Sequence, residues 1–255
     1  MILSHARRFI FLKTSKTAGT SIEIALSQLC GERDVITPIS PEDEKIRQRL
    51  GFRGPQNYLA PLADYGPRDL GRLLVGRRKA RFYNHMSARE ILQHVGRDVW
   101  DSYYKFCFER NPWDRVISYY YWRYRSEPRP DLAAFVASEI PARLRLSGFA
   151  LYTLDGEIAV DRVCRYEDLA GELARIRARL GVAQELTLPR AKSSLRPAGT
   201  IERSSTASRS RASAGSSKRR SACSAMSRSR SDDRAGECRR DSGCRRRCRR
   251  ATGRD

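Results

Sequence analysis

The first part of the chain combines a short apolar run with a helical repeat of apolar positions. The run Phe9–Leu12 is too short for a buried helix and has the length of a buried strand. Apolar residues then recur at intervals of three and four, on one face of a helix: Ile22, Ala25, Leu26 and Leu29. Gly31 follows this repeat, where helices commonly end. The pattern predicts a strand, a tight loop and a helix.

A second unit of this kind is predicted around the histidine at position 85. The segment Arg81–Tyr83 reads as a strand, and Ser87 and Glu90 have the S-x-x-E spacing of a capping box. We therefore expect a helix directly after Ser87, ending at Gly96. His85 lies in the turn before it, where α/β proteins place reactive groups. A lone loop histidine is more often without a special role, and that alternative stays open.

A third unit follows the aromatic segment Tyr103–Phe108, which is a strand candidate. Asn111 is a good helix N-cap and Pro112 suits the first helical position. Arg110 is then expected at the end of the strand, where its planar fork can bind phosphate oxygens. Ser118 would lie roughly 10 Å along the helix, at about 1.5 Å per residue. Packing is the simpler explanation for this serine, and the alternative is a function that uses its hydroxyl group.

The remaining chain is less clearly patterned. We expect loop over Gly51–Gly71, which is rich in Gly and Pro, a strand at Ala159–Cys164 and a helix over Leu169–Leu180. Directly after the expected loop lies a basic cluster made of Arg72, Arg77, Arg78, Lys79 and Arg81. Such a cluster is usually a solvated face, and it can also attract an acidic substrate.

The last 55 residues differ from the rest in composition. Residues 201–255 hold 17 Lys and Arg against 6 Asp and Glu, a net of +11 out of +21 for the whole chain. They contain no Phe, Tyr, Trp, Leu or Val, so we expect a disordered basic tail after an α/β domain of residues 1–200. The tail is either genuine, and binds nucleic acid or another polyanion, or the product of a reading-frame shift, which we favour.

The composition also predicts the compartment. The N-terminus lacks the pattern of a signal peptide, and no apolar run approaches the roughly 18 residues of a transmembrane helix. We therefore expect no membrane span and a cytoplasmic protein. The cysteines of the body are expected to be buried free thiols: Cys30, Cys107 and Cys164.

The loop Lys16–Ser21 has the chemistry of an anion site. The first amides of a helix have no partner within it, and the helix dipole places positive charge there. Gly19 permits a positive φ, several side chains offer hydroxyl donors, and Lys16 offers a mobile charge. The plain alternative is an ordinary turn with solvated lysines. The nucleotide loop G-x-x-x-x-G-K-[ST] is not present, because Lys16 precedes Gly19 and the first glycine is missing.

Several motifs in order resemble the sulfotransferase family. KTAGTS at Lys16–Ser21 and RNPWDRVISYYY at Arg110–Tyr121 are similar to its two cofactor loops. The similarity is greater to the carbohydrate type, which includes heparan sulfate 2-O-sulfotransferases and bacterial relatives. NHMSAREI at Asn84–Ile91 resembles the histidine segment, and RYEDL at Arg165–Leu169 and LPRAKSSLRP at Leu188–Pro197 resemble later segments. The resemblance covers roughly residues 7–197.

This resemblance implies a fold, a reaction and a set of residues. The fold would be a P-loop-NTPase-like three-layer α/β core with a mainly parallel sheet flanked by helices. The donor would be 3′-phosphoadenylyl sulfate (PAPS), and the acceptor a hydroxyl, commonly on a glycan, with no metal required. His85 matches the catalytic base, and Arg110 and Ser118 match the pair that holds the 3′-phosphate. The residues that match the loop around the 5′-phosphosulfate are Lys16, Thr17, Ala18, Gly19, Thr20 and Ser21. Of these, Lys16 would also take part in catalysis.

The sequence departs from the family in three places. Ser15 stands where proline is common, and Lys13 where histidine is frequent. Beyond Ala198 the expected Tyr-rich segment is missing, so the domain of residues 1–200 would be C-terminally incomplete and its activity in doubt. Two other functions stay open: a P-loop nucleotide or sugar kinase, and a non-catalytic polyanion-binding protein. Neither the acceptor nor the oligomeric state can be read from the sequence.

Overall fold

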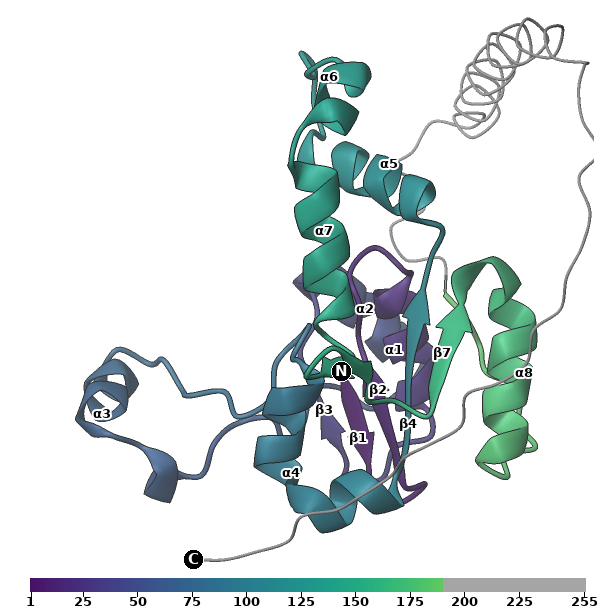
Figure 1. Ribbon diagram of the computed structural model, residues 1–255. Coiled ribbons are helices and arrows are strands. Elements are labelled where there is room, and N and C mark those ends of the chain that lie inside the picture. The colour runs from purple at the N-terminus through teal and green to yellow at the C-terminus, as the bar shows by residue number, and fades with distance from the viewer. Residues whose placement is uncertain (190–255) are drawn as a thin grey trace, which may run out of the picture. The chain divides into compact units, whose positions relative to one another are not determined.

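A mixed five-stranded sheet forms the centre of the fold (Figure 1). The computed structural model describes residues 1–189, so the predicted tail at 201–255 lies outside the described residues. The sheet has the strand order β3-β1-β2-β4-β7. Its strands are β1 (Ile2–Ser4), β2 (Phe9–Leu12), β3 (Val35–Ile36), β4 (Tyr104–Glu109) and β7 (Arg162–Arg165).

The sheet is only half parallel, so the expectation of a mainly parallel sheet was too strong. β4 pairs in parallel with both β2 and β7, whereas β1 pairs antiparallel with both β2 and β3. A turn of four residues joins β1 to β2, and so short a connection can only join antiparallel strands. β1 itself was not predicted, because three residues are too few to show a periodic pattern.

Helices cover both faces of the sheet, as expected for an α/β protein. Along β2, Phe9 and Phe11 point to the face of the sheet that α1 and α8 cover, while Ile10 and Leu12 point to the face that α4 covers. The helices are α1 (Gly19–Ser27), α2 (Pro41–Arg49), α3 (Pro67–Leu74), α4 (Ala88–Ser102), α5 (Pro112–Arg123), α6 (Leu132–Ala137), α7 (Ile140–Phe149) and α8 (Leu169–Arg179). Within residues 1–189, no helix is long and apolar enough to cross a membrane.

Several local predictions are confirmed. Ser87 and Glu90 form the reciprocal capping box and start α4, and the Asn111 side chain accepts from the first amides of α5. The three body cysteines are buried and free: Cys30, Cys107 and Cys164. These features depend on neighbours in sequence or on apolar character alone, which is why the sequence reveals them.

Other local predictions are wrong in whole or in part. Arg81–Tyr83 forms no strand, and the amides of Arg81 and Phe82 instead donate to the Tyr58 carbonyl at 2.8 and 2.9 Å. The expected helix end at Gly96 is confirmed only in part, because Gly96 interrupts the helical conformation of α4 at φ 80° and ψ 167° and a second helical segment then continues to Ser102. The predicted loop Gly51–Gly71 also contains the beginning of α3.

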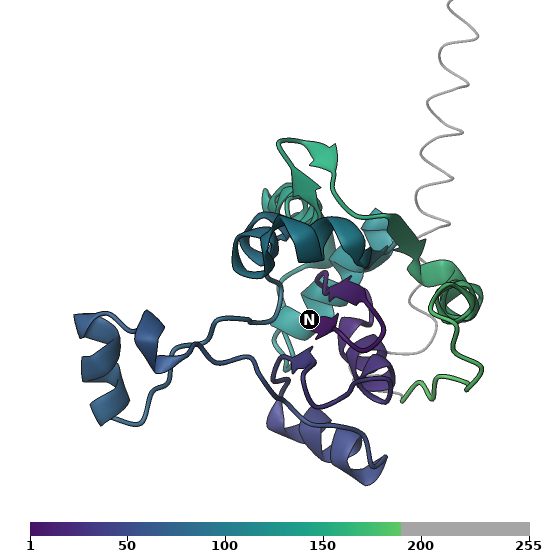
Figure 2. The same ribbon diagram turned by 90° about the horizontal axis from the view of Figure 1, so that it is seen from below.

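Two groups of elements extend beyond the sheet. α5, α6 and α7 form a helical group with its own core, made of Val116, Tyr120, Phe135 and Leu144. α3 and the short 3-10 helix Leu62–Asp64 stand apart from the sheet in both ribbon views (Figures 1 and 2).

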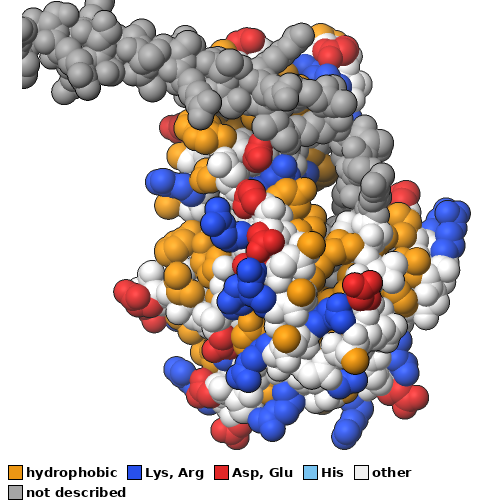
Figure 3. All heavy atoms as spheres, turned by 90° about the vertical axis from the view of Figure 1, so that its right-hand side faces the viewer, with side chains coloured by type: hydrophobic (Ala, Val, Ile, Leu, Met, Phe, Trp, Pro, Cys, Tyr) orange, Lys and Arg blue, Asp and Glu red, His pale blue; other side chains and the backbone are white. Residues whose placement is uncertain are grey.

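On the face nearest α8, acidic, basic and apolar side chains are interspersed rather than gathered by type (Figure 3).

Candidate functional site

A cavity of about 710 Å³ opens where three parallel strands end. The loops after β2, β4 and β7 meet there, because the carboxyl ends of parallel neighbours share one edge of a sheet. It is lined by Lys13, Thr14, Ser15, Lys16, Ala18, Gly19, Thr20, Ser21, Ile39, Ser40, Asn84, His85, Arg110, Ser118, Tyr119, Tyr121, Trp122, Tyr166, Leu169, Leu188 and Pro189.

The loop after β2 adopts an unusual backbone conformation. Lys16 and Ala18 both have positive φ, of 66° and 58°, a region that residues other than glycine rarely occupy. Gly19 does not have the positive φ that its position in the sequence allowed. Its small size is needed for another reason, because a Cβ there would lie 2.8 Å from Lys13 Cγ. The loop therefore packs tightly against the end of β2.

A pair of threonines fixes this loop to the sheet. The Thr14 and Thr17 hydroxyls lie 2.9 Å apart, and the Thr14 hydroxyl donates to the Phe108 carbonyl of β4. Thr17 also donates to the Thr14 carbonyl at 3.2 Å and is buried. Of the predicted loop residues, Thr17 alone does not line the cavity, so its side chain shapes the loop from within.

The other loop residues lie around the start of α1. Ala18 is the N-cap and has no side-chain oxygen to accept from the first amides of the helix. The cavity wall at this point is made of Ala18, Gly19, Thr20 and Ser21. The Lys16 ammonium lies over the Trp122 ring of α5, at 5.1 Å from the ring centroid. The site thus combines a helix N-terminus with a positive charge.

Arg110 reaches the same cavity from the end of β4. Its guanidinium stacks over the Tyr166 ring at 4.3 Å, which holds the plane of the fork. The Arg110 Nε atom is buried and has no hydrogen-bond partner within the described chain. Ser118, two turns into α5, lines the same cavity. Both residues of the predicted pair therefore line the same cavity.

His85 makes its shorter hydrogen bond to the backbone of Lys13, and the Ser15 hydroxyl lies 3.4 Å from the same ring nitrogen. Its Nδ1 lies 2.9 Å from the Lys13 carbonyl, which can only accept, so the proton of the neutral ring is on Nδ1 and Nε2 carries a lone pair. Partial burial of the ring, followed by the charge of Lys13, lowers the pKa of His85 from 6.5 to about 4. The residue as a whole is nonetheless exposed to solvent. The ring is therefore neutral at pH 7.

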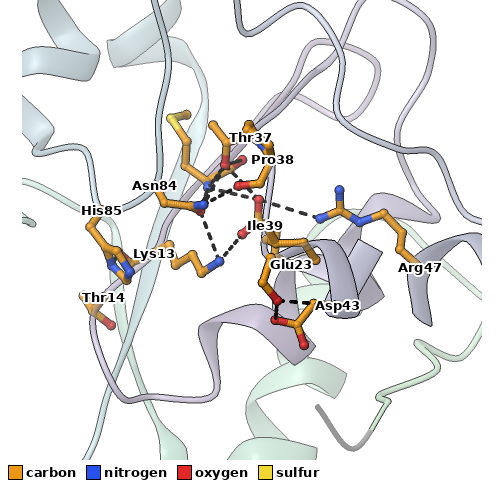
Figure 4. Close-up of polar contacts among 12 residues, drawn as sticks. Lys13, Thr14, Glu23, Thr37, Pro38, Ile39, Asp43, Arg47, Asn84 and His85 are labelled. Carbon is orange, nitrogen blue, oxygen red and sulfur yellow. Dashed lines mark hydrogen bonds and ion pairs between the residues drawn. The ribbon is translucent and has the colours of Figure 1, made fainter. Parts of the chain in front are cut away.

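A buried polar network lies behind the histidine (Figure 4). The Lys13 ammonium donates to Glu23 at 2.7 Å and to the Asn84 side-chain carbonyl at 3.1 Å. Thr37 donates to the same carboxylate at 2.9 Å, and the Arg47 guanidinium lies 3.8 Å from it. Burial alone would raise the pKa of Glu23, but the surrounding cations outweigh it and hold that pKa below its usual range. The network therefore fixes Asn84, the residue directly before His85.

Eight of the nine predicted site residues line the cavity, and the structure adds several that the sequence analysis missed. The aromatic residues Tyr121 and Trp122 lie three and four positions beyond Ser118, on the same face of α5. That spacing could have indicated both residues from the sequence. Asn84 could have been found in the same way, because it is adjacent to His85. Tyr166 and Leu188 could not, because they reach the cavity only through the folding of distant segments.

Comparison with known proteins gives one relative. No family model matches the chain, and no solved structure matches it. A protein of Archaeoglobus fulgidus described as an uncharacterized protein is 33% identical over 104 residues, which are 40% of this chain and 87% of the archaeal protein. That description states no activity, so the comparison assigns no role to the cavity residues. The chain belongs to the same family as this archaeal protein.

Proposed function

We propose that the protein transfers a sulfuryl group from PAPS to a hydroxyl acceptor, most readily a hydroxyl of a glycan. One observation carries the proposal: a single cavity combines a neutral histidine with a cationic loop at a helix N-terminus. A base and an anion site within one cavity are what sulfuryl transfer to a hydroxyl requires. The cavity of about 710 Å³ is within the usual range for sites that enclose a nucleotide-sized ligand.

The residues fit an anionic nucleotide donor. The N-terminal end of α1, with Lys16 beside it, suits the phosphosulfate group. The buried Arg110 Nε has no acceptor among residues 1–189, and an anion in the cavity could supply one. Ser118 supplies a hydroxyl that lines the same cavity. We assign the loop to the 5′ end of the donor and the Arg110 wall to its 3′-phosphate.

The chain's own groups would act in two ways. His85 Nε2 would take the proton from the acceptor hydroxyl as its oxygen attacks sulfur. Lys16 and the first amides of α1 would stabilise the negative charge that develops on the departing phosphate oxygen. Sulfuryl transfer resembles phosphoryl transfer in that positioning and charge stabilisation matter more than covalent catalysis.

Two other functions fit the cavity less well. A P-loop kinase would need the lysine after the second glycine of its loop, whereas here Lys16 precedes Gly19. Magnesium-dependent turnover of ATP would favour the kinase. A polyanion-binding protein would need no histidine with a free nitrogen in the cavity. Binding that disappears when residues 201–255 are deleted would favour it.

The proposal is tested by transfer of radiolabelled sulfate from PAPS to a mixture of desulfated glycans. The informative variant is His85→Asn, because asparagine tolerates the positive φ of 61° found at this position and can still donate to the Lys13 carbonyl. We expect a loss of about 10²- to 10⁴-fold in rate, since the base is removed and the loop conformation is kept.

The matched control is His94→Asn on α4, whose ring packs on Phe82 at 5.7 Å and does not line the cavity. This control should transfer at the wild-type rate. A wild-type protein without transferase activity, or a His85→Asn variant as fast as wild type, would contradict the proposal.

A further inference from the structure

A projecting segment of the fold carries features that the cavity does not use. We call residues 60–81 the basic arm. Its two ends are joined by the Ala60 amide, which donates to the Lys79 carbonyl at 2.9 Å. α3 lies at its far end, away from the sheet in both ribbon views (Figures 1 and 2), and no residue of α3 is buried. The arm therefore contributes little to the core of the domain.

The arm exposes apolar side chains at an unusual density. Four large apolar residues within 14 positions are exposed: Leu62 by 63%, Leu70 by 51%, Leu74 by 89% and Val75 by 73%. Leu70 and Leu74 are one helical turn apart, so they share a face of α3. Exposed apolar groups gathered in this way mark interaction sites more often than groups scattered singly.

The same arm is strongly basic. It holds six Lys and Arg against two Asp, a net of +4 in 22 residues. A cavity of about 350 Å³ in the arm is lined by Asp69, Arg72, Arg77, Arg78 and Lys79. Asp69 pairs with Lys79 at 2.9 Å, which leaves the positive charge of the arginines in excess. This charge favours an anionic partner.

Charge and shape together narrow the choice of partner. A second copy of the chain would oppose one +4 arm to another, and residues 201–255, with a net of +11, would repel the arm as well. An acidic polymer would satisfy the arginines and leave the leucines in water. A protein groove that binds a helix contacts apolar side chains over two helical turns, from position i to i+7. α3 has eight residues and its apolar positions begin at the fourth, so it is too short for such a groove.

We infer that the basic arm docks the protein on an anionic lipid surface. Leu70, Leu74 and Val75 enter the boundary between headgroups and acyl chains, while the neighbouring arginines bind the lipid phosphates. A lipid surface supplies both apolar volume and negative charge, and it requires no shaped groove. Docking of this kind needs no transmembrane helix.

The test is sedimentation of the full chain with vesicles of phosphatidylcholine containing phosphatidylglycerol, compared with phosphatidylcholine alone. The informative variant is Leu74→Glu, which should fold normally because Leu74 is 89% exposed. We expect its affinity for the anionic vesicles to fall about tenfold or more, since an apolar side chain that enters the bilayer becomes a charge of the wrong sign. The control is Leu146→Glu on α7, 64% exposed and outside the arm, which should bind as wild type does.

A second variant separates the arm from the basic C-terminal residues, which also attract anionic vesicles. In Leu74→Trp, brominated acyl chains should quench the added tryptophan if the arm inserts. Equal binding of wild type and Leu74→Glu would overturn the inference and assign vesicle binding to residues 201–255. Absence of quenching, or of vesicle binding, would also overturn it and leave an acidic protein as the partner of the arm.

Discussion

At the scale of single residues, His85 combines a strained backbone with a defined tautomer. Its φ is 61°, and its Nδ1 donates to the carbonyl of Lys13, 72 positions earlier in the chain. Residues other than glycine keep such a conformation only where the surrounding structure holds it, which often happens at functional sites. The lone pair on Nε2 is thus set by the fold around the loop and not by the local sequence.

The first prediction concerns the pH dependence of transfer. In the free protein the pKa of His85 is about 4, so kcat/KM should stay level from neutral pH down to about pH 5 and fall as His85 becomes protonated. An anionic donor in the cavity would raise this pKa, because negative charge stabilises the imidazolium. The acid limb of kcat should therefore lie at higher pH than that of kcat/KM.

The measurement is the pair of pH profiles, with circular dichroism at each pH to confirm that the protein stays folded. His94→Asn should reproduce both wild-type profiles. A kcat limb at or below the pH of the kcat/KM limb would show that the donor does not bind beside His85.

At the scale of elements, the tight packing between the loop and β2 is the critical feature. Gly19 begins α1 directly over the Lys13 side chain, and Thr14 fixes the same loop to β4. The capping boxes and N-caps of α4 and α5 were predictable, because each involves residues two or three positions apart. The tight approach at Gly19 was not, because it depends on the position of a side chain on another element.

The second prediction compares two helical glycines. In Gly19→Ala the new Cβ would lie 2.8 Å from Lys13 Cγ and 3.3 Å from the Thr14 carbonyl oxygen. We expect a loss of about 1–3 kcal/mol in the free energy of unfolding, as for other overpacked sites. Urea denaturation measures it.

The control for Gly19→Ala is Gly71→Ala in α3, where a Cβ would meet nothing within 4 Å. Alanine is the better helix former by about 0.5–1 kcal/mol, so this variant should not be less stable than wild type. A Gly19→Ala protein as stable as wild type would show that the loop can move away from the end of β2.

At the scale of the whole molecule, a buried ionic network connects segments that are far apart in sequence. Glu23 of α1 is fully buried and contacts Lys13, Thr37 and Arg47 from three other segments (Figure 4). Neither this network nor the antiparallel half of the sheet could be predicted from the sequence, because both arise from pairing between distant segments. Local apolar and capping patterns did reveal the α/β class and four of the eight helices within residues 1–189, namely α1, α4, α5 and α8.

The third prediction concerns this network. Glu23→Gln should reduce the free energy of unfolding by about 3–5 kcal/mol, because it removes one charge and leaves buried cations without a counter-charge. The folded-state pKa of Glu23 lies below its ordinary 4.5, so its contribution is present above that pH and is lost as the pH falls through the lowered value. The variant should therefore lose stability less steeply with acid.

Urea denaturation from neutral to acidic pH measures both effects. Glu139→Gln at the N-cap of α7 is the control, because that carboxylate is 80% exposed and pairs with Arg143 at the surface. It should change the free energy of unfolding by less than about 0.5 kcal/mol. A Glu23→Gln protein with the acid sensitivity of wild type would remove Glu23 as the source of that sensitivity.

The most direct measurement is calorimetric titration of the purified chain with 3′-phosphoadenosine 5′-phosphate, the product left by the donor. The account predicts micromolar binding that does not depend on magnesium. Arg110→Ala should weaken it about tenfold or more, because a charge-assisted contact is lost. The exposed Arg97→Ala on α4 should bind as wild type does. Absence of binding to the folded protein, or equal binding by Arg110→Ala, would contradict the assignment of this cavity to the donor.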